Sequence, residues 1–434
     1  MPLPDNPSDA SQHDAYAALR FRDFRFLISA SFLISFSQAV LSVIVGYELY
    51  LRTGSALALG LVGLVQIVPN VILSMPAGQF VDQHDHRLIA SAAAGLIALA
   101  AAFLALLTHY EGPLILIYAC LFLIGLGRVF NMATPAPLMA SIVPPDRFHN
   151  AAAWRSSSNQ TASILGPAAG GFGVAVLGSA SSVFAIAAVL LAIASVLLSR
   201  IKARPSPRER EKMSKDSILA GIRFIRSTEV LLATITLDMV AVMLGGATAL
   251  LPIFAEDVLH VGAAGLGLLR AAPAVGAVLA SVAIAHKGPF KAAGPTILVA
   301  VAGFGLATIL FGVSRAMPLS LLALALIGAF DAISMVIRST LQLTLTPDHM
   351  RGRVGSVHYM FVGMSNEFGE FESGLVATLI GATAAVVLGG IGTLLVVPAI
   401  ALAWPQVRRL REIKPRESEI TVTAPVTASS VAGK

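Results

Sequence analysis

The feature that most constrains this chain is a series of apolar runs, each about twenty residues or longer, that recurs from one end to the other. About 20 apolar residues in a helix span the hydrocarbon core of a bilayer. With 56% hydrophobic and 12% charged residues among 434, the chain has too little polar surface for a water-soluble protein. We therefore predict an all-α polytopic membrane protein with twelve transmembrane helices, at residues 24–47, 57–80, 88–108, 114–138, 151–178, 182–200, 229–255, 263–286, 295–313, 317–343, 354–378 and 382–404.

The distribution of basic residues predicts the orientation of these helices. An even number of spans places both termini on the same side of the membrane. Most of the 30 Lys and Arg residues fall in the tails and loops of that side, whereas Arg52 and Arg315 fall in loops of the other. Because cytoplasmic loops carry the excess of Lys and Arg, both termini are expected to be cytoplasmic. The localisation expected is the bacterial inner membrane.

One long polar connection divides the helices six and six. It carries the mixed-charge string Arg208-Glu209-Arg210-Glu211-Lys212, which is typical of a solvated linker, and no nucleic-acid partner is expected. The predicted organisation is a cytoplasmic tail at 1–22, a six-helix bundle at 23–201, a cytoplasmic linker at 202–227, a second six-helix bundle at 228–405 and a cytoplasmic tail at 406–434.

The two halves repeat each other in sequence. Gly63, Leu64 and Pro69 match Gly267, Leu268 and Pro273 at a constant offset of 204 residues. A similar offset relates the loop at 145–147 to the loop at 347–349. The pattern predicts two pseudo-symmetric bundles with parallel topology, which is the arrangement of secondary transporters that bind substrate between their halves near the midplane.

Two charges lie at matching places inside the apolar runs. Arg128 interrupts the run at 114–138, and Asp331 lies 203 residues later in the run at 317–343. An ionisable residue at that depth usually faces a cavity or a partner, so we predict that both bind substrate in a cavity between the halves and that Asp331 also carries a proton. The alternatives are structural ion pairs, for Asp331 with Arg338, although seven residues span about 10 Å along a helix and contact would require bent side chains.

Further polar residues within the runs are candidates for the same functions. Glu367 and Glu370 share a helical face and could hold one proton between them, unless they instead contact Arg351 or Arg353. Asp238 is a further candidate for proton coupling, with pairing to a basic residue as the alternative. Asn131 and Asn159 are candidates for substrate hydrogen bonds, although amides in membrane helices also join neighbouring helices.

Several motifs resemble the major facilitator superfamily. The loop after the second run reads Gly78-Gln-Phe-Val-Asp82-Gln-His-Asp85-His-Arg87 and resembles the conserved loop motif of the family, with Gln83 and His86 departing from it. The string Gly166-Pro167-Ala-Ala-Gly170-Gly171 resembles the family's antiporter motif. The resemblance implies gating roles for Gly78, Asp82, Arg87, Gly166, Pro167, Gly170 and Gly171.

Four other segments resemble the branch of the family that includes the enterobactin exporter. They lie at 19–25, 53–60, 350–354 and 365–374. This resemblance implies a proton-coupled antiporter that exports a small polar or amphipathic molecule, such as a siderophore. A broad drug exporter and a non-transporting membrane scaffold or sensor remain alternatives.

The partners and cofactors expected follow from this interpretation. The partners are a small-molecule substrate, protons and membrane lipid, and the protein is expected to act as a monomer. The chain shows no phosphate-binding glycine loop, no metal-ligand histidine spacing and no nucleophile with a base. We therefore expect no metal, no cofactor and no enzymatic activity.

Overall fold

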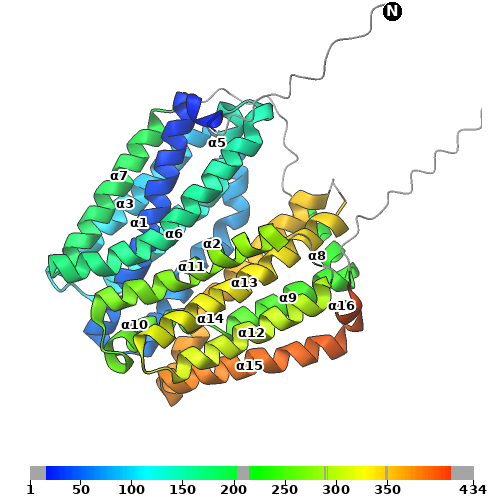
Figure 1. The fold of residues 1–434 in the computed structure, drawn as a ribbon. Coiled ribbons are helices and arrows are strands. Elements are labelled where there is room, and N and C mark those ends of the chain that lie inside the picture. The colour runs from blue at the N-terminus through cyan, green and yellow to red at the C-terminus, as the bar shows by residue number, and fades with distance from the viewer. Residues whose placement is uncertain (1–15, 203–214, 288–289, 291, 348–349, 412–434) are drawn as a thin grey trace, which may run out of the picture.

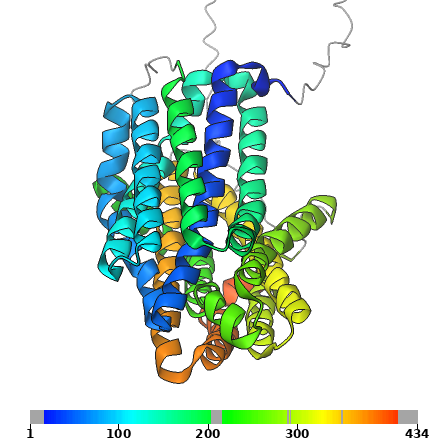
Figure 2. The same ribbon diagram turned by 90° about the vertical axis from the view of Figure 1, so that its left-hand side faces the viewer.

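The computed structural model describes residues 16–202, 215–287, 290, 292–347 and 350–411. Every regular element in these ranges is helical, and the helices form two bundles (Figure 1). The bundles converge near α10 and diverge toward the ends where α5 and α8 lie. Figure 2 shows the helices of the amino-terminal bundle running side by side, with the other bundle joining them toward one end.

The amino-terminal bundle is formed by six spanning segments. Two of them, α1 and α6, end at Gly54 and Gly178, whose positive φ angles of 57° and 66° are easily adopted by glycine. Proline starts a new helix at Pro135, so the predicted run at 114–138 is divided between α4 and α5. The segments are α1 (Arg22–Thr53), α2 (Ala56–Gln83), α3 (His86–His109), α4 (Leu114–Ala133) with α5 (Pro135–Ile142), α6 (Phe148–Leu177) and α7 (Ala180–Ser199).

The carboxyl-terminal bundle repeats this arrangement with one broken segment. The predicted run at 229–255 is interrupted at Gly245 and Gly246, because paired glycines favour helix poorly. The chain then continues through short helical pieces that include Pro252. The elements are α9 (Glu229–Leu244), η3 (Ala247–Leu250), α10 (Leu251–Ile253), η4 (Phe254–Val258), α11 (Gly262–Lys287), α12 (Ala293–Val313), α13 (Met317–Leu345), α14 (Arg351–Ile380), α15 (Ala382–Ala403) and α16 (Pro405–Arg409).

In the described residues, 11 segments are long and apolar enough to cross a membrane. The twelfth is α14, whose 30 residues are long enough but include the polar side chains of Asn366, Glu367 and Glu370. These polar residues lower the mean hydropathy of α14, so it is not among the 11 segments selected by length and apolar composition. The predicted twelve-helix, two-bundle fold is confirmed.

Part of the range predicted as a linker is helical. The helix α8 (Lys215–Ser227) places Ile225 in an apolar cluster with Ile235, Val354 and Val357 of α9 and α14. Its Gly221 lies close to α14, since a Cβ atom built there would be 2.9 Å from the carbonyl oxygen of Arg353. The remainder of the predicted linker, 203–214, and most of the predicted tails, 1–15 and 412–434, lie outside the described residues.

The buried core shows where the bundles meet. One apolar cluster includes Ile44 and Leu49 of α1 together with Leu250, Phe254 and Leu266 of the other bundle. The other end, where the described chain starts at Tyr16 and stops at Arg411, is the side of the termini. Separate clusters form there, one around Phe24 and Leu198 in the first bundle and another around Leu231 and Val407 in the second. The bundles therefore share a core at the end away from the termini and separate toward the other.

Candidate functional site

Glycines bring the two bundles into close contact at the shared end. A Cβ atom built on Gly171 of α6 would lie 2.2 Å from the carbonyl oxygen of Ala263 in α11. One built on Gly374 of α14 would lie 2.7 Å from the Cα atom of Gly60 in α2. Such distances leave room only for hydrogen at these positions, so two helix pairs, α6 with α11 and α2 with α14, form the close part of the interface.

A polar contact reinforces this closed end. The hydroxyl group of Tyr50, in the last turns of α1, donates a hydrogen bond to the carboxylate of Asp257 in η4. The contact joins the two bundles directly. Nearby, Arg52 bonds to Glu48 and to the carbonyl oxygen of Gly112, which holds α1 against the end of α3 within its own bundle.

The packing around Arg128 follows the internal repeat. A Cβ atom on Gly125 of α4 would lie 3.3 Å from Cγ of Pro69 in α2. In the second bundle, the matching Gly328 of α13 would place its Cβ 1.9 Å from the carbonyl oxygen of Pro273 in α11. The same pair of residues thus joins the equivalent helices in both halves.

Arg128 lies in a cavity at the interface between the bundles. Its Nη1 donates a hydrogen bond of 2.7 Å to Oε1 of Gln66 in α2. Asn70 of the same helix also lines the cavity, and Glu367 of α14 lines it from the other bundle. The Oε2 atom of Glu367 is buried without a hydrogen-bond partner in the structure. A fixed cation of one half and a carboxylate of the other therefore face the same space.

Glu370 has a different environment from Glu367. A Cβ atom built on Gly63 of α2 would lie 3.1 Å from Oε2 of Glu370, so this carboxylate reaches the close interface between α2 and α14. It is also near enough to interact electrostatically with Arg270 of α11, whose Nη1 donates to the carbonyl oxygen of Thr248 at 3.0 Å. Glu370 and Glu367 are three residues apart and share a helical face, although their side chains contact different neighbours.

A second group of charges lies inside the carboxyl-terminal bundle. Arg338 of α13 is 5% exposed and pairs through Nη1 with Asp238 of α9. Its Nη2 atom lies 3.7 Å from Oδ1 of Asp331, so the two side chains span seven residues of one helix. The expectation that this spacing is too long for easy contact is therefore not supported. The side chain of Asp331 is 40% exposed, against 7% for Asp238.

The two matching charges of the repeat line different cavities. Asp331 and Asp238 line a cavity with Phe304 and Ser334 within the carboxyl-terminal bundle, whereas Arg128 lines the cavity between the bundles. The predicted sharing of one cavity by Arg128 and Asp331 is not seen in this state. A substrate-binding role for Asp331 remains a prediction.

The two asparagines named from the sequence lie on different helices, Asn131 on α4 and Asn159 on α6. The Nδ2 atom of Asn131 is buried without a hydrogen-bond partner in the structure. Asn159 of α6 accepts a hydrogen bond of 3.1 Å from the hydroxyl of Ser35 and lines a cavity of about 370 Å³ with Arg155 and Gln160. Asn159 therefore lines a cavity, and the roles of both asparagines in binding remain predictions.

The glycine motif of α6 packs against two neighbouring helices. Gly166 and Gly170 face α1, where their Cβ atoms would lie 2.6 Å from Cβ of Ala39 and 3.2 Å from the carbonyl oxygen of Val40. Pro167 instead faces the other bundle, because its carbonyl oxygen would lie 2.7 Å from a Cβ atom on Gly267. The motif therefore joins α6 both to its own bundle and, with Gly171, to α11.

The loop motif after α2 is described only in part. Arg87 bonds through Nε to Asp85 at 2.7 Å and through Nη1 to the carbonyl oxygen of Ile201 at 3.2 Å, which joins the start of α3 to the end of α7. The surroundings of Gly78 and the side chain of Asp82 lie outside the described part of the structure. Gating by this loop remains a prediction.

Three residues of the site were not predicted from the sequence. Gln66 and Asn70 lie four apart in an otherwise apolar run, a spacing that places them on one face of α2. Arg270 follows Gln66 by 204 residues, which is the repeat offset. A search for polar residues at equivalent positions of the two halves would have identified all but Asn70, whose equivalent is Ala274.

Comparison with known proteins assigns the family. A sequence model of the Major Facilitator Superfamily matches residues 27–369. The chain belongs to this superfamily. The superfamily consists of membrane transporters, and its architecture agrees with the two-bundle fold, so the protein is a multi-pass membrane transporter.

Curated relatives include exporters. The chain is 26% identical over 396 residues to the enterobactin exporter EntS of Citrobacter koseri, an alignment that covers 90% of this chain and 94% of that protein. It is 25% identical over 397 residues to EntS of Escherichia coli, with coverage of 91% and 94%. The resemblance predicted from the motifs is confirmed.

Solved structures show the same fold. The nucleoside transporter NupG has a TM-score of 0.69 at 12% identity, covering 88% of this chain and 99% of NupG. A bacterial homologue of the human lysosomal transporter Spinster has a TM-score of 0.67 at 13% identity, covering 92% and 98%. These similarities show that the chain has the same fold as these solved transporters.

Proposed function

We propose that this transporter is a proton-coupled antiporter that exports a small polar or amphipathic anion, such as a siderophore, across the bacterial inner membrane. Both termini and the linker at 202–227 are on the cytoplasmic side, and the protein works as a monomer. The observation that carries the proposal is the cavity in which Arg128 of one bundle faces Glu367 of the other.

Arg128 is suited to anchor an anionic group of the substrate. A guanidinium has five N–H donors in a planar fork and stays charged at any working pH. The hydrogen bond to Gln66 uses one of these donors. The others can bind carboxylate or catecholate oxygens of a substrate, whose negative charge then compensates the guanidinium together with that of Glu367.

The direction of opening supports loading from the cytoplasm. The bundles share an apolar core at the end away from the termini and have separate cores at the other end. A substrate therefore enters from the side of the termini. Release on the far side requires the Gly171–Gly267 and Tyr50–Asp257 contacts to separate as the bundles rock about the cavity.

The charge balance of the second cluster suits proton binding. Arg338 carries one positive charge and faces two carboxylates, Asp238 and Asp331, so the cluster has one surplus negative charge when both are ionised. Uptake of one proton makes the cluster neutral, which lowers the cost of a charge within the membrane. We assign this proton to Asp331, because its side chain is the more exposed of the two.

The sign of coupling separates Asp331 from Glu367. An anion bound to Arg128 attracts a proton to the carboxylate beside it, so a proton on Glu367 would move in the same direction as the substrate. That linkage corresponds to symport. Antiport requires a proton site outside this cavity, and the cluster around Arg338 meets this requirement.

A chain of packed elements connects the two sites. Asp238 lies on α9, and the following Gly246 packs against α14, since its Cβ atom would lie 2.6 Å from the carbonyl oxygen of Gly369. The same α14 helix carries Glu367 into the cavity of Arg128. A change in the pairing of Arg338 can thus shift α9 and, through α14, change the position of Glu367 in the substrate cavity.

The relatives support the choice of substrate class. The two described above are named enterobactin exporters and align with nine-tenths of this chain. Enterobactin-like catecholates carry several closely spaced oxygen atoms, which can accept hydrogen bonds from a guanidinium fork. The first candidate substrate is accordingly a catecholate siderophore.

The decisive experiment uses inside-out membrane vesicles with an acidic lumen. Proton-coupled export predicts that a catecholate siderophore accumulates in the lumen, that its addition makes the lumen less acidic, and that a protonophore abolishes the accumulation. Vesicles without this protein are the control. Accumulation that survives the protonophore would refute proton coupling, and the absence of any substrate-dependent proton movement would favour a scaffold or sensor.

A further inference from the structure

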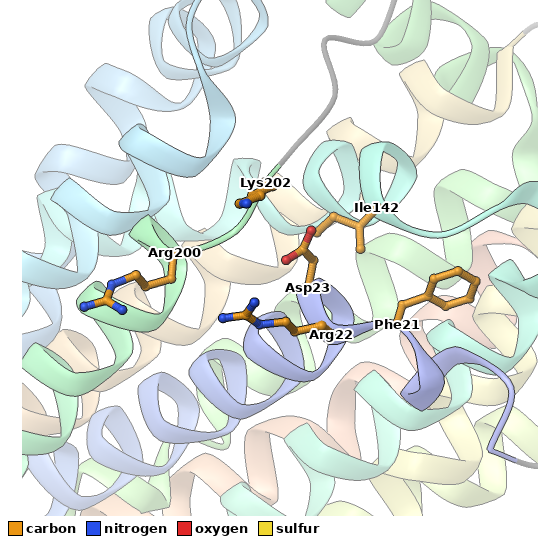
Figure 3. A pocket seen from close by; sticks show the side chains of 6 residues that line it. All are labelled: Phe21, Arg22, Asp23, Ile142, Arg200 and Lys202. Carbon is orange, nitrogen blue, oxygen red and sulfur yellow. The ribbon is translucent and has the colours of Figure 1, made fainter.

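A cavity outside the transport path lies where α1 begins and where α5 and α7 end (Figure 3). It is on the side of the termini and has a volume of about 380 Å³. Its lining residues are Phe21, Arg22, Asp23, Ile142, Arg200 and Lys202. The proposed transport mechanism uses none of them.

The cavity has an excess of positive charge. The lining holds three cations, Arg22, Arg200 and Lys202, and one carboxylate, Asp23, so its net charge is +2. Within the described part of the chain, no side-chain hydrogen bond or ion pair is formed by these three cations; Arg22 only stacks over Phe26, with its Cζ atom 5.2 Å from the ring centroid. Arg52, Arg87 and Arg338, by contrast, are all paired within the protein.

The side chains leave the cations available to a ligand. In Figure 3 the side chains of Arg22 and Arg200 extend in the same direction from two different helices, while Asp23 points toward Ile142. The carboxylate therefore does not lie between the two guanidinium groups. Two guanidinium groups and an ammonium group offer N–H donors to the oxygens of a phosphate.

An apolar stripe on α7 leads directly to this cavity. Ile186, Val189, Ile193 and Val196 are 50%, 59%, 45% and 54% exposed and recur every three or four residues, so they form one face of the helix. Arg200 follows on the same face, four residues after Val196. In the membrane, exposed apolar side chains on an outer helix contact lipid acyl chains, and Arg200 then lies at the level of the headgroups.

We propose that this cavity binds the phosphate of an anionic phospholipid, such as phosphatidylglycerol or cardiolipin, whose acyl chains lie along the stripe on α7. Basic pockets between membrane helices on the cytoplasmic side are suited to such headgroups. The apolar stripe selects lipid over soluble phosphate, because a free ion gains nothing from it. The site is independent of the exported substrate.

Lipid binding to the full-length protein in detergent tests the site. Native mass spectrometry counts bound phosphatidylglycerol across a titration, with zwitterionic phosphatidylcholine, which has no net charge, as the comparison. The triple variant Arg22→Gln, Arg200→Gln and Lys202→Gln should bind phosphatidylglycerol about tenfold or more weakly, since each cation near a membrane surface contributes substantially to anionic lipid binding. Binding of phosphatidylcholine should not change.

The matched control removes three exposed cations at the same end of the other bundle, with Arg226→Gln, Arg408→Gln and Arg409→Gln. This variant should retain the wild-type affinity. A second variant, Asp23→Asn, should bind phosphatidylglycerol more tightly, because it removes the one opposing charge; such a gain does not arise from misfolding. Equal lipid binding by the wild type and the pocket variant, or displacement of the lipid by an equimolar amount of inorganic phosphate, would overturn the proposal.

Discussion

Gly171 of α6 and Gly267 of α11 lie against each other across the two bundles, so that a Cβ atom built on Gly171 would be 2.8 Å from the Cα atom of Gly267. The same atom would be 2.2 Å from the carbonyl oxygen of Ala263. Both obstacles are backbone atoms, which cannot rotate away as a side chain can. We therefore predict that Gly171→Ala separates the bundles at this end and shifts the protein toward the state open on the far side.

Spin labels on the outer ends of the bundles measure this shift. Leu51 of α1 and Leu379 of α14 are 55% and 76% exposed, which makes them suitable labelling positions. The distance distribution between the labels should move to longer values in the Gly171→Ala variant. The control is Gly173→Ala, whose new methyl group meets only the side chain of Val183 within the same bundle, at 3.2 Å. Equal distance distributions in the two variants would show that Gly171 does not hold the bundles together at this end.

Arg128→Lys tests the anchoring of the substrate. Lysine keeps the charge but lacks the planar fork, so we predict that an anionic substrate binds about tenfold more weakly, a loss of about 1.4 kcal/mol. Binding of a catecholate to the detergent-purified protein by calorimetry gives the dissociation constant. The bond to Gln66 Oε1 can still be made by an ammonium group, which limits structural damage.

The matched control for this substitution is Arg315→Lys. Arg315 is exposed at the opposite end of the other bundle and donates to Thr383 Oγ1 at 3.3 Å. Its replacement should leave the affinity unchanged. An unchanged affinity in the Arg128→Lys variant as well would show that Arg128 serves the interface between the bundles and not the substrate.

The helices could be predicted from the sequence because a helix that crosses the membrane must be apolar over most of its length. Most predicted runs agree with the observed helices to within a few residues; the run at 57–80 corresponds to α2, Ala56–Gln83. The breaks at Thr134 and at Gly245 could not be predicted from hydropathy, since the residues on both sides are equally apolar. They result from local backbone preferences of Pro135 and of the glycine pair.

The site could be predicted only where a residue type is itself unusual. Arg128 stands out in any apolar run, and the repeat offset leads from it to Asp331. The partners of these residues depend on the directions of the side chains, which cannot be derived from the spacing of residues in the sequence. The side chain of Arg338 extends back along α13 to Asp331 and also pairs with Asp238 of α9. Glu367 lines the same cavity as Arg128 because α14 packs against α2.

The membrane orientation can be tested by labelling single cysteines. Tyr110, at the end of α3, is 76% exposed on the side opposite the termini, and Arg409 is exposed on the side of the termini. In intact cells, an impermeant thiol reagent should label Tyr110→Cys and should leave Arg409→Cys unlabelled, because the proposed orientation places the basic side in the cytoplasm. The native Cys120 is buried, so it contributes little background. The reverse pattern would invert the assigned orientation and, with it, the direction of transport.

The two acids of the second cluster should differ in their contribution to stability. Asp238 and Arg338 are 7% and 5% exposed and form a direct ion pair, whereas Asp331 is 3.7 Å from the same guanidinium and 40% exposed. Asp238→Asn leaves the buried guanidinium of Arg338 without its direct ion pair and should lower the free energy of unfolding by on the order of 3 kcal/mol. Asp331→Asn should lower it by less. Thermal unfolding of the purified proteins in one detergent gives the order, and a larger loss for Asp331→Asn would contradict this distinction.

Coupling distinguishes the acids in a different way. Asp331→Asn preserves the shape of the side chain but removes the group assigned to the proton, so the variant should exchange substrate down its gradient at nearly the wild-type rate and lose accumulation driven by a pH gradient. Asp146→Asn, an exposed acid paired with Arg147 outside the bundles, is the control and should keep both activities. Glu367→Gln should also keep pH-driven accumulation, because a proton on Glu367 would travel with an anion and not against it. Retained accumulation in Asp331→Asn, together with its loss in Glu367→Gln or Glu370→Gln, would place the coupling site on α14 and exclude the charge-balance mechanism of Arg338.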